Sequence, residues 1–463
     1  GDFMIEALQS LLSKDQVLND ASTLSEYGHD WAKNIDFNAS AVVFPRSTEE
    51  VVKLVQWARK EKVALIPSGG RTGLSGAATA TKGEVIVSFQ KMNRILEFSD
   101  VDSSVWIEPG VITEDLQNFA KDKGLYFPID FAARGSSQVG GNIATNAGGI
   151  HVLRYGLTRD WVMSLEVVTG TGEVLKLNQG LIKNATGYDL RHLMIGSEGT
   201  LGFVTKAEMR LCPPPKETMV FLFAVDSLAS IMEVFKSFRK NLSLIAFEMF
   251  TQEALSLVVE SESSRKAPFD SEYPYYLVVE GEKDSVDAED RALALFEECV
   301  EKGLIVDGVL AQSPQQAKEL WSYREDISEC ATPFSPYKND ISVRISKVPG
   351  FLESTESLLK KEYPDLRVVW FGHIGDGNLH INILKPESMD KTEFLSKCAH
   401  ASELLFQSLQ KFEGSISAEH GVGIVKKPYL EFTRSKAEVE IFRGIKKSFD
   451  PDGILNPGKI FDL

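Results

Sequence analysis

The chain has 463 residues, of which 43% are apolar and 25% are charged, and its formal charge at pH 7 is −16. This length exceeds one ordinary hydrophobic core, so we expect two or three structural units with ample buried area. The acidic balance argues against a nucleic-acid footprint or an anionic membrane surface. An anionic substrate therefore has to be attracted by a local cluster of cations. No run approaches the roughly 18 apolar residues of a membrane span.

The four cysteines lie far apart in the sequence, with no paired spacing. Neither a disulfide framework nor a thiolate metal site is indicated, and we expect reduced thiols in a reducing compartment. The cytoplasm is the expected location, with the mitochondrial matrix as the alternative if a transit peptide has been removed.

The first part of the chain alternates helical and extended patterns. Ser47-Thr-Glu-Glu50 has the spacing of a capping box and predicts a helix over residues 47–61. The remaining patterns predict strands at 63–67, 84–89 and 104–109, a helix near 114–123 and a hairpin at 164–177. Residues 134–149 are dense in glycine and lack hydrophobic periodicity, so we interpret them as a buried loop shaped around a ligand.

Three consecutive prolines after Cys212 can continue neither a helix nor a central strand, so we place a boundary near residue 213. Beyond it, extended patterns occupy 218–225, 246–251, 275–282, 340–346 and 379–384, and helical patterns occupy 227–240, 286–302, 350–362 and 390–412. This order predicts an antiparallel sheet with helices on one face. A final helix near 436–448 precedes a turn-rich tail.

Three glycine-rich loops lie in the first part of the chain, at residues 67–76, 135–149 and 196–202. Closely spaced glycines let several backbone N–H groups converge on an anion such as a pyrophosphate. The P-loop is excluded because no Gly-Lys-Ser/Thr follows, and the Rossmann spacing is not met at 69–76 or at Gly170-Thr-Gly172. Three such loops in one unit indicate a large cofactor held by another fold.

Three of the seven histidines, His373, His380 and His420, fall in two glycine-spaced stretches, and Glu419 precedes the last of them. Two neutral imidazoles and one carboxylate are common ligands of a catalytic divalent metal, which leaves one histidine as a candidate base. Glycines disfavour a helix at 371–378, so a strand, a Gly-Asp-Gly turn and a returning strand are expected to bring the first two imidazoles together. In extended chain, Glu419 and His420 are expected to point in opposite directions.

Several of these motifs together resemble the FAD-linked oxidoreductases of the vanillyl-alcohol oxidase type, over nearly the whole chain. They are the loop at 67–76, Gly140-Gly-Asn-Ile-Ala-Thr-Asn-Ala-Gly-Gly149, Arg154-Tyr-Gly156, Asn184-Ala-Thr-Gly-Tyr-Asp-Leu190, Ile195-Gly-Ser-Glu-Gly-Thr-Leu-Gly202 and Leu211-Cys-Pro-Pro-Pro215. The resemblance implies an α+β fold with a two-lobed FAD-binding domain at 1–212, an antiparallel-sheet substrate (cap) domain with the metal site at 213–425, and a helical tail at 426–463 that returns to the FAD domain.

The resemblance also implies which residues surround the flavin. In some relatives a histidine in the first glycine loop tethers the flavin covalently, but this chain has Arg71 and no nearby histidine or cysteine, so dissociable FAD is expected. The implied FAD-binding residues are Pro67, Ser68, Gly69, Gly70, Arg71, Thr72, Gly73, Ser75, Gly76, Gly135, Ser136, Gly140, Gly141, Asn142, Ala144, Thr145, Asn146, Gly148, Glu198, Gly199, Gly202 and Asn456.

For the metal, the resemblance implies His373, His380 and Glu419 as ligands, usually of zinc with manganese as the alternative, and His420 as the catalytic base that also contacts substrate. It further implies Arg324, Ser328, Lys338 and Asn382 as substrate contacts. Arginine grips a carboxylate in bidentate fashion and lysine adds a point charge. Serine at 328 departs from the threonine of the family pattern; it keeps the hydroxyl and loses a methyl group.

The implied activity is oxidation of a D-2-hydroxy acid to the 2-oxo acid, with D-2-hydroxyglutarate first and D-lactate or D-malate as alternatives. A flavin-carrying subunit of a larger electron-transfer complex, as in glycolate oxidase, is a second reading. A non-haem Fe(II) oxygenase also uses two histidines and a carboxylate but has no need of the glycine loops. The expected partners are the hydroxy acid, an electron-transfer flavoprotein or quinone as acceptor, and a second copy of the chain.

Overall fold

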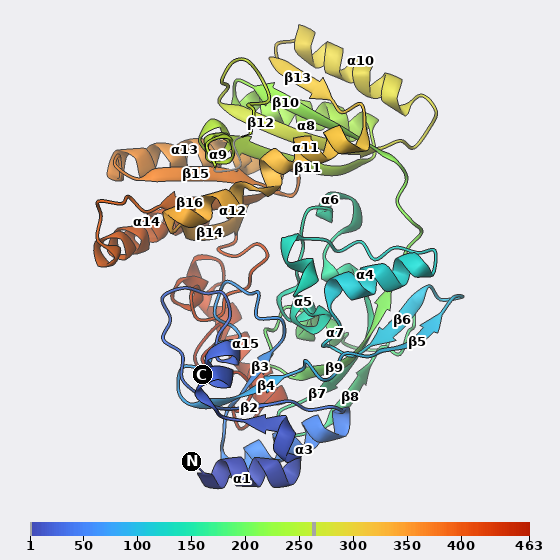
Figure 1. Cartoon of the computed structure of the whole chain (residues 1–463), viewed down its shortest axis with the longest axis vertical. Coiled ribbons are helices and arrows are strands. Elements are labelled where there is room, and N and C mark those ends of the chain that lie inside the picture. The colour runs from blue at the N-terminus through green and yellow to red at the C-terminus, as the bar shows by residue number, and fades with distance from the viewer. Residues whose placement is uncertain (1, 262–264) are drawn as a thin grey trace. The chain divides into compact units, whose positions relative to one another are not determined.

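The computed structural model describes residues 2–261 and 265–463 (Figure 1). Contacts divide the chain into two compact units. The first comprises residues 1–149, 156–214 and 419–463, and the second comprises 150–155 and 215–418.

The first unit contains two sheets. A four-stranded sheet has the order β1 (Val17–Leu18), β2 (Ala39–Val43), β4 (Glu84–Ser88) and β3 (Leu65–Ser68). Its β2, β4 and β3 run parallel. A five-stranded antiparallel sheet has the order β5 (Ile95–Ser99), β6 (Ser104–Ile107), β9 (Phe203–Arg210), β7 (Val162–Val168) and β8 (Val174–Leu177). One apolar core joins Val85 and Val87 of the first sheet to Val168 and Phe203 of the second.

The helices of the first unit are α1 (Asp2–Leu11), α2 (Ala21–Tyr27), α3 (Thr48–Glu61), α4 (Thr113–Asp122), α5 (Val139–Thr145), α7 (Arg191–Met194) and α15 (Lys436–Phe449). Helix α3 begins at the expected N-cap, because the Ser47 side chain accepts the Glu50 N–H, whereas the Glu50 carboxylate accepts the Arg46 N–H and not that of Ser47. Its Val51, Leu54, Val55 and Ala58 are buried on one face, as the helical spacing predicts.

The second unit is a seven-stranded sheet in which every paired neighbour is antiparallel. Its order is β13 (Asp307–Leu310), β10 (Thr218–Val225), β12 (Tyr275–Glu282), β11 (Leu244–Thr251), β15 (Arg367–Gly372), β16 (Asn378–Leu384) and β14 (Tyr337–Ser342). The helices are α6 (Val152–Tyr155), α8 (Leu228–Asn241), α9 (Gln252–Val259), α10 (Ala288–Glu301), α11 (Pro314–Glu325), α12 (Ile327–Ala331), α13 (Val348–Glu362) and α14 (Lys391–Lys411).

Helices cover both faces of this sheet, so the expectation of helices on one face is wrong. Phe221 and Phe223 of β10 contact the rings of Phe238 on α8 and Phe296 on α10. The intervening Val220, Leu222 and Ala224 pack in a different core, with residues of α9 and α11. The sequence does indicate helices on both faces, because β10 is an uninterrupted apolar run, which is typical of a strand buried on both sides.

Two chain segments depart from the simple division expected from sequence. Residues 150–155 belong to the second unit, where α6 packs against β11. The chain leaves that unit after Ala418, before the expected residue 425, because the backbone N–H groups of Ile424 and Val425 both donate to Ser75 O in the first unit.

The glycine-dense stretch 134–149 is not a simple loop. It contains the helix α5, with Val139, Asn142 and Ile143 buried, after a short 3-10 turn at Ala132–Gly135. Gly140 fits in α5 because an added Cβ would lie 2.6 Å from Pro109 Cβ. Close approach of two backbone segments therefore explains a glycine that a helix otherwise disfavours.

Candidate active site

The two histidines of the first glycine-spaced stretch lie on a β-hairpin. Strand β15 ends at Gly372, a 3-10 turn covers Ile374–Asp376, and β16 returns from Asn378. The ring centroids of His373 and His380 are 5.2 Å apart. The expected strand, turn and returning strand are thus confirmed, and they bring the two imidazoles together.

Each of these histidines has a carboxylate at Nδ1. His380 Nδ1 lies 3.0 Å from Asp340 Oδ1, and His373 Nδ1 lies 2.9 Å from Glu248 Oε2. Burial lowers the pKa of the His380 imidazole, although the Asp340 carboxylate opposes this shift. A neutral ring with its Nδ1 held by a carboxylate is the form in which histidine binds a metal through Nε2.

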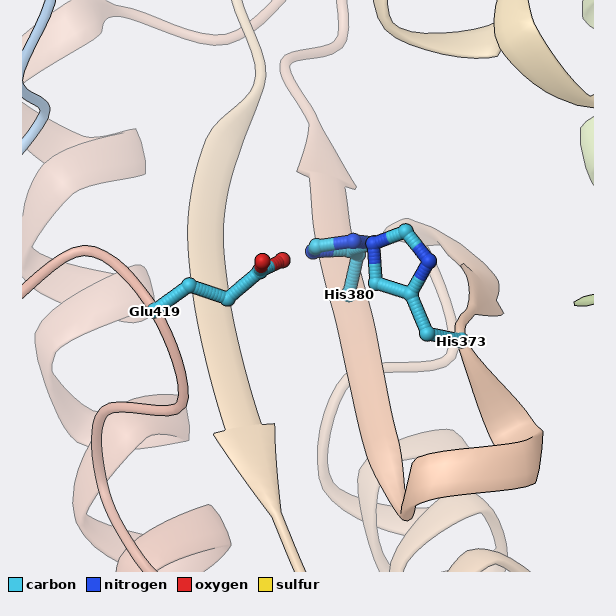
Figure 2. A group of neighbouring side chains, drawn as sticks. All are labelled: His373, His380 and Glu419. Carbon is cyan, nitrogen blue, oxygen red and sulfur yellow. The ribbon is translucent and has the colours of Figure 1, made fainter. Parts of the chain in front are cut away.

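Glu419 completes the predicted donor set. One ligand-type atom from each of His373, His380 and Glu419 lies within 4.8 Å of the other two. Figure 2 shows the Glu419 carboxylate directed toward the two rings. The backbone just before Glu419 is anchored, because the Ala418 N–H donates to Asp340 O at 3.2 Å.

Glu419 and His420 do not diverge as extended chain would require. Residues 418–420 form bends, and ligand-type atoms of Glu419, His420 and Asp340 also lie within 4.8 Å of one another. The glycines that follow, Gly421 and Gly423, have positive φ of 78° and 52°, so the chain turns sharply here.

Of the predicted substrate contacts, Arg324 and Asn382 are buried, with 7% and 2% of their surface exposed. Arg324 Nε and Asn382 Nδ2 have no hydrogen-bond partner among the described residues. Buried N–H donors are rarely left unpaired, so these two atoms indicate an acceptor that the described residues do not supply. A substrate carboxylate has that chemistry.

The other two predicted contacts are exposed. Lys338 lies on β14 directly opposite Asn382 of β16, so the sheet register makes these two residues neighbours. Ser328 lies on α12, which follows the helix that carries Arg324. A cation–π contact also holds the Arg324 side chain, because its guanidinium lies 4.9 Å from the Phe371 ring centroid.

The glycine loops of the first unit pack closely on one another. An added Cβ at Gly70 would lie 2.2 Å from Ser136 O, and one at Gly199 would lie 2.4 Å from Pro67 Cγ. Asn456 Nδ2 donates to Ala77 O and to Glu198 O, so the tail reaches the same loops. Predicted FAD-binding residues distant in the sequence are therefore gathered in one region of this unit.

The chemistry of these loops suits a polar cofactor. Ser68 Oγ and Gln138 Oε1 are buried and lack a hydrogen-bond partner within residues 2–261 and 265–463. Gly141 has open space where its Cβ would be. Two orphaned polar atoms beside an open glycine surface fit a cofactor with hydrogen-bonding groups, as FAD has.

Glu198, in the third glycine loop, holds the segment that follows His420. Its carboxylate accepts the N–H groups of Val422 and Gly423, at 3.1 and 2.8 Å. Burial raises the pKa of this carboxyl to about 7, although these two donors and the Lys459 ammonium oppose the shift. Burial likewise lowers the pKa of Lys459 to about 8.

Two family models match the chain. The FAD binding domain matches residues 39–178, and the C-terminal domain of FAD linked oxidases matches residues 214–460. The chain belongs to the FAD-linked oxidase family. The resemblance drawn from the sequence motifs is confirmed, and with it the α+β fold class and the use of FAD.

This FAD-linked oxidase is similar to curated proteins over its whole length. It is 54% identical over 458 residues to the D-2-hydroxyglutarate dehydrogenase of Stutzerimonas stutzeri, covering 99% of this chain and 98% of the relative. It is 50% identical over 461 residues to the D-2-hydroxyglutarate dehydrogenase of Xanthomonas citri, covering 100% and 97%.

Solved structures share the fold at low identity. A 4-ethylphenol oxidase from Gulosibacter chungangensis matches with a TM-score of 0.76 at 19% identity, covering 100% of this chain and 97% of the other. A p-cresol methylhydroxylase matches with a TM-score of 0.77 at 17% identity and the same coverage. Within the part of the oxidase that the structure describes, no helix is long and apolar enough to cross a membrane.

Sequence reasoning missed three polar residues of this oxidase. Glu248 and Asp340 hold the histidine rings, and Gln138 carries one of the orphaned atoms near the glycine loops. The sequence does single out Glu248, because it is the one charged residue in the apolar run Leu244–Thr251. A charged residue inside a continuous apolar strand indicates a buried group with a specific partner.

Proposed function

We propose that this FAD-linked oxidase is a D-2-hydroxyglutarate dehydrogenase that oxidises D-2-hydroxyglutarate to 2-oxoglutarate with dissociable FAD and a divalent metal ion. The observation that carries the proposal is the identity of 54% and 50% to two such enzymes over at least 97% of both chains. The buried, unpaired donors of Arg324 and Asn382 support an anionic substrate.

FAD would be held by the glycine loops at 67–76, 135–149 and 196–202 and by Asn456. The orphaned Ser68 Oγ can donate to or accept from its polar groups, and the orphaned Gln138 Oε1 can accept from them. When bound, FAD supplies the acceptor for the hydride that leaves C2 of the hydroxy acid. Arg71 in the first loop provides no nucleophile for a covalent tether.

His373, His380 and Glu419 would hold the metal ion. Two imidazoles and a carboxylate with a position left for substrate suit zinc first, and manganese is the alternative. A divalent ion in such a site supplies charge withdrawal that lowers the pKa of a hydroxyl group. The carboxylates at both histidine Nδ1 atoms favour binding through Nε2.

His420 acts as the general base. Its imidazole takes the proton from the C2 hydroxyl oxygen, so loss of that proton and of the C2 hydride converts the alcohol to the 2-oxo acid. The Arg324 guanidinium binds a substrate carboxylate, and Lys338, Ser328 and Asn382 add a cation, a hydroxyl and an amide. These contacts orient the C2 hydroxyl toward His420.

We further propose that the enzyme works in the cytoplasm as a homodimer, and that an electron-transfer flavoprotein or a quinone reoxidises it. The decisive test of substrate is a panel of D-2-hydroxyglutarate, its L-enantiomer, D-malate and D-lactate, assayed with a soluble artificial acceptor on protein of known flavin and zinc content. The highest kcat/KM is expected for D-2-hydroxyglutarate. A higher value for D-lactate, or equal values for both enantiomers, contradicts the assignment.

A further inference from the structure

Glu248 is a carboxylate in an otherwise apolar environment. It lies on β11, where all eight residues are buried, and only 1% of its own surface is exposed. A buried carboxylate is costly unless charge and hydrogen bonds compensate it. Glu248 is therefore expected to have charged or hydrogen-bonding partners.

Two side chains of the candidate active site, one of them the Arg324 cation, provide that compensation. Glu248 Oε1 lies 3.0 Å from Arg324 Nη2 in an ion pair, and Oε2 lies 2.9 Å from His373 Nδ1. The ion pair with Arg324 and the contact with His373 offset the cost of burying this carboxylate.

Three elements fix this arrangement within the second unit. Strands β11 and β15 pair with Met249 opposite Gly372, so the next position of the same register sets Glu248 beside His373. Helix α11, which carries Arg324 in its last turn, packs on β11. The Arg324 guanidinium also lies over Phe371, two residues before His373. One carboxylate thus contacts a side chain from a helix and a side chain from the residue that follows the neighbouring strand.

We propose that Glu248 is a positioning residue that holds the predicted metal ligand His373 and the predicted substrate-binding Arg324 in a fixed relation. Its carboxylate accepts the His373 Nδ1–H, which leaves Nε2 as the metal-binding atom. The same carboxylate binds Arg324 through Nη2, so the buried Nε–H is presented to a substrate carboxylate. Binding of the metal and binding of the acid therefore depend on one residue, a step that rests on the proposed function.

The test compares Glu248→Gln with a matched control, Glu282→Gln, in the full flavin-loaded protein. Glu282 is a second buried glutamate of the same sheet, 3.0 Å from Arg154 Nε, and has no predicted catalytic or binding role. Glu248→Gln is expected to weaken zinc binding about 10- to 100-fold in competition with a chromophoric chelator. At saturating zinc it is expected to raise the KM for D-2-hydroxyglutarate about tenfold, with a smaller change in kcat. Glu282→Gln leaves both within twofold.

A measurement on the unsubstituted protein covers the case in which Glu248→Gln does not fold. Nitrogen-15 NMR of the histidine rings, assigned with a His373→Gln variant, is expected to show a proton on His373 Nδ1 in zinc-free protein. A bare Nδ1, or unchanged zinc affinity and KM in a folded Glu248→Gln variant, overturns the proposal. Failure of the unsubstituted enzyme to oxidise D-2-hydroxyglutarate contradicts the proposed function instead, because the ring measurement does not depend on substrate.

Discussion

Asp340 and His380 face each other across paired strands, and the Asp340 carboxylate lies 3.0 Å from His380 Nδ1. Asp340 Oδ1 also accepts the Asn378 amide at 2.7 Å, so the carboxylate is held from two sides. A carboxylate at Nδ1 fixes the tautomer of a metal-binding histidine and raises its basicity as a ligand.

Asp340→Asn is therefore expected to weaken zinc binding about 10- to 100-fold, because the amide removes the negative charge that orients His380. Chelator competition on purified protein measures the change. Asp307→Asn is the matched control, since Asp307 lies on β13 of the same sheet and accepts only a tyrosine hydroxyl and its neighbouring backbone N–H among the bonds described. Zinc affinity of Asp340→Asn within twofold of the parent would show that Asp340 does not support metal binding by His380.

Gly70→Ala is expected to abolish or strongly reduce flavin binding. Its Cβ would lie 2.2 Å from Ser136 O and 2.9 Å from Ser137 Cα, which forces two of the predicted FAD loops apart. Overpacking of this kind costs about 1–3 kcal/mol or more. The ratio of flavin to protein absorbance measures the loss. Gly444→Ala in α15, where a Cβ meets nothing within 4 Å, should keep its full flavin content; equal content in both variants argues against the loop assignment.

His420→Asn is expected to lower the rate of flavin reduction by D-2-hydroxyglutarate about 10²- to 10⁴-fold, because a general base is lost. The flavin content should be unchanged. His400→Asn serves as the control, as this exposed histidine lies on α14. Stopped-flow absorbance under anaerobic conditions gives both rates, and a His420→Asn rate close to that of His400→Asn would exclude proton removal by His420.

The buried Glu198 carboxyl is expected to make the free energy of unfolding depend on pH. Its pKa is raised from 4.5 to about 7, so the folded state retains a proton that the unfolded chain loses as the pH rises between these values. Stability from this group is therefore complete below about pH 4.5 and is lost as the pH rises through 7. The loss amounts to about 3 kcal/mol at most.

Denaturant unfolding of the enzyme and of Glu198→Gln at pH 5 and pH 8 tests this dependence. Glutamine does not titrate, so the difference in free energy of unfolding between the two proteins should shift in favour of the variant as the pH rises. The constant cost of replacing one acceptor of the Val422 and Gly423 N–H groups cancels in this comparison. A difference independent of pH contradicts the raised pKa.

Parts of the fold were predictable because local chemistry determines them. The hairpin around residues 371–384 follows from its glycines and its apolar returning strand, and α3 follows from its cap and its apolar face. The helix α11, which carries Arg324, was not predicted, since only Leu320, Trp321 and Arg324 are buried and the apolar face is short. Ser313 as N-cap and Pro314 at the first position were its only strong signals.

In the candidate site, too, some residues could be predicted from the sequence and others could not. Histidines and a glutamate among glycines stand out in the sequence because few other roles need that combination. Glu248 and Asp340 do not stand out, since their importance arises from strand pairing that brings together residues more than 30 positions apart. Gln138 does not stand out in the sequence either, because its unpaired side-chain oxygen is recognised only once the surrounding loop is folded.

The most direct test of the central claim is anaerobic mixing of the zinc-loaded enzyme with D-2-hydroxyglutarate, followed by the flavin absorbance near 450 nm. Full bleaching is expected, with one 2-oxoglutarate formed per flavin, loss of bleaching after zinc is removed by a chelator, and recovery when zinc is restored. Flavin that stays oxidised in the zinc-loaded protein, or bleaching that is unaffected by removal of the metal, would contradict the claim.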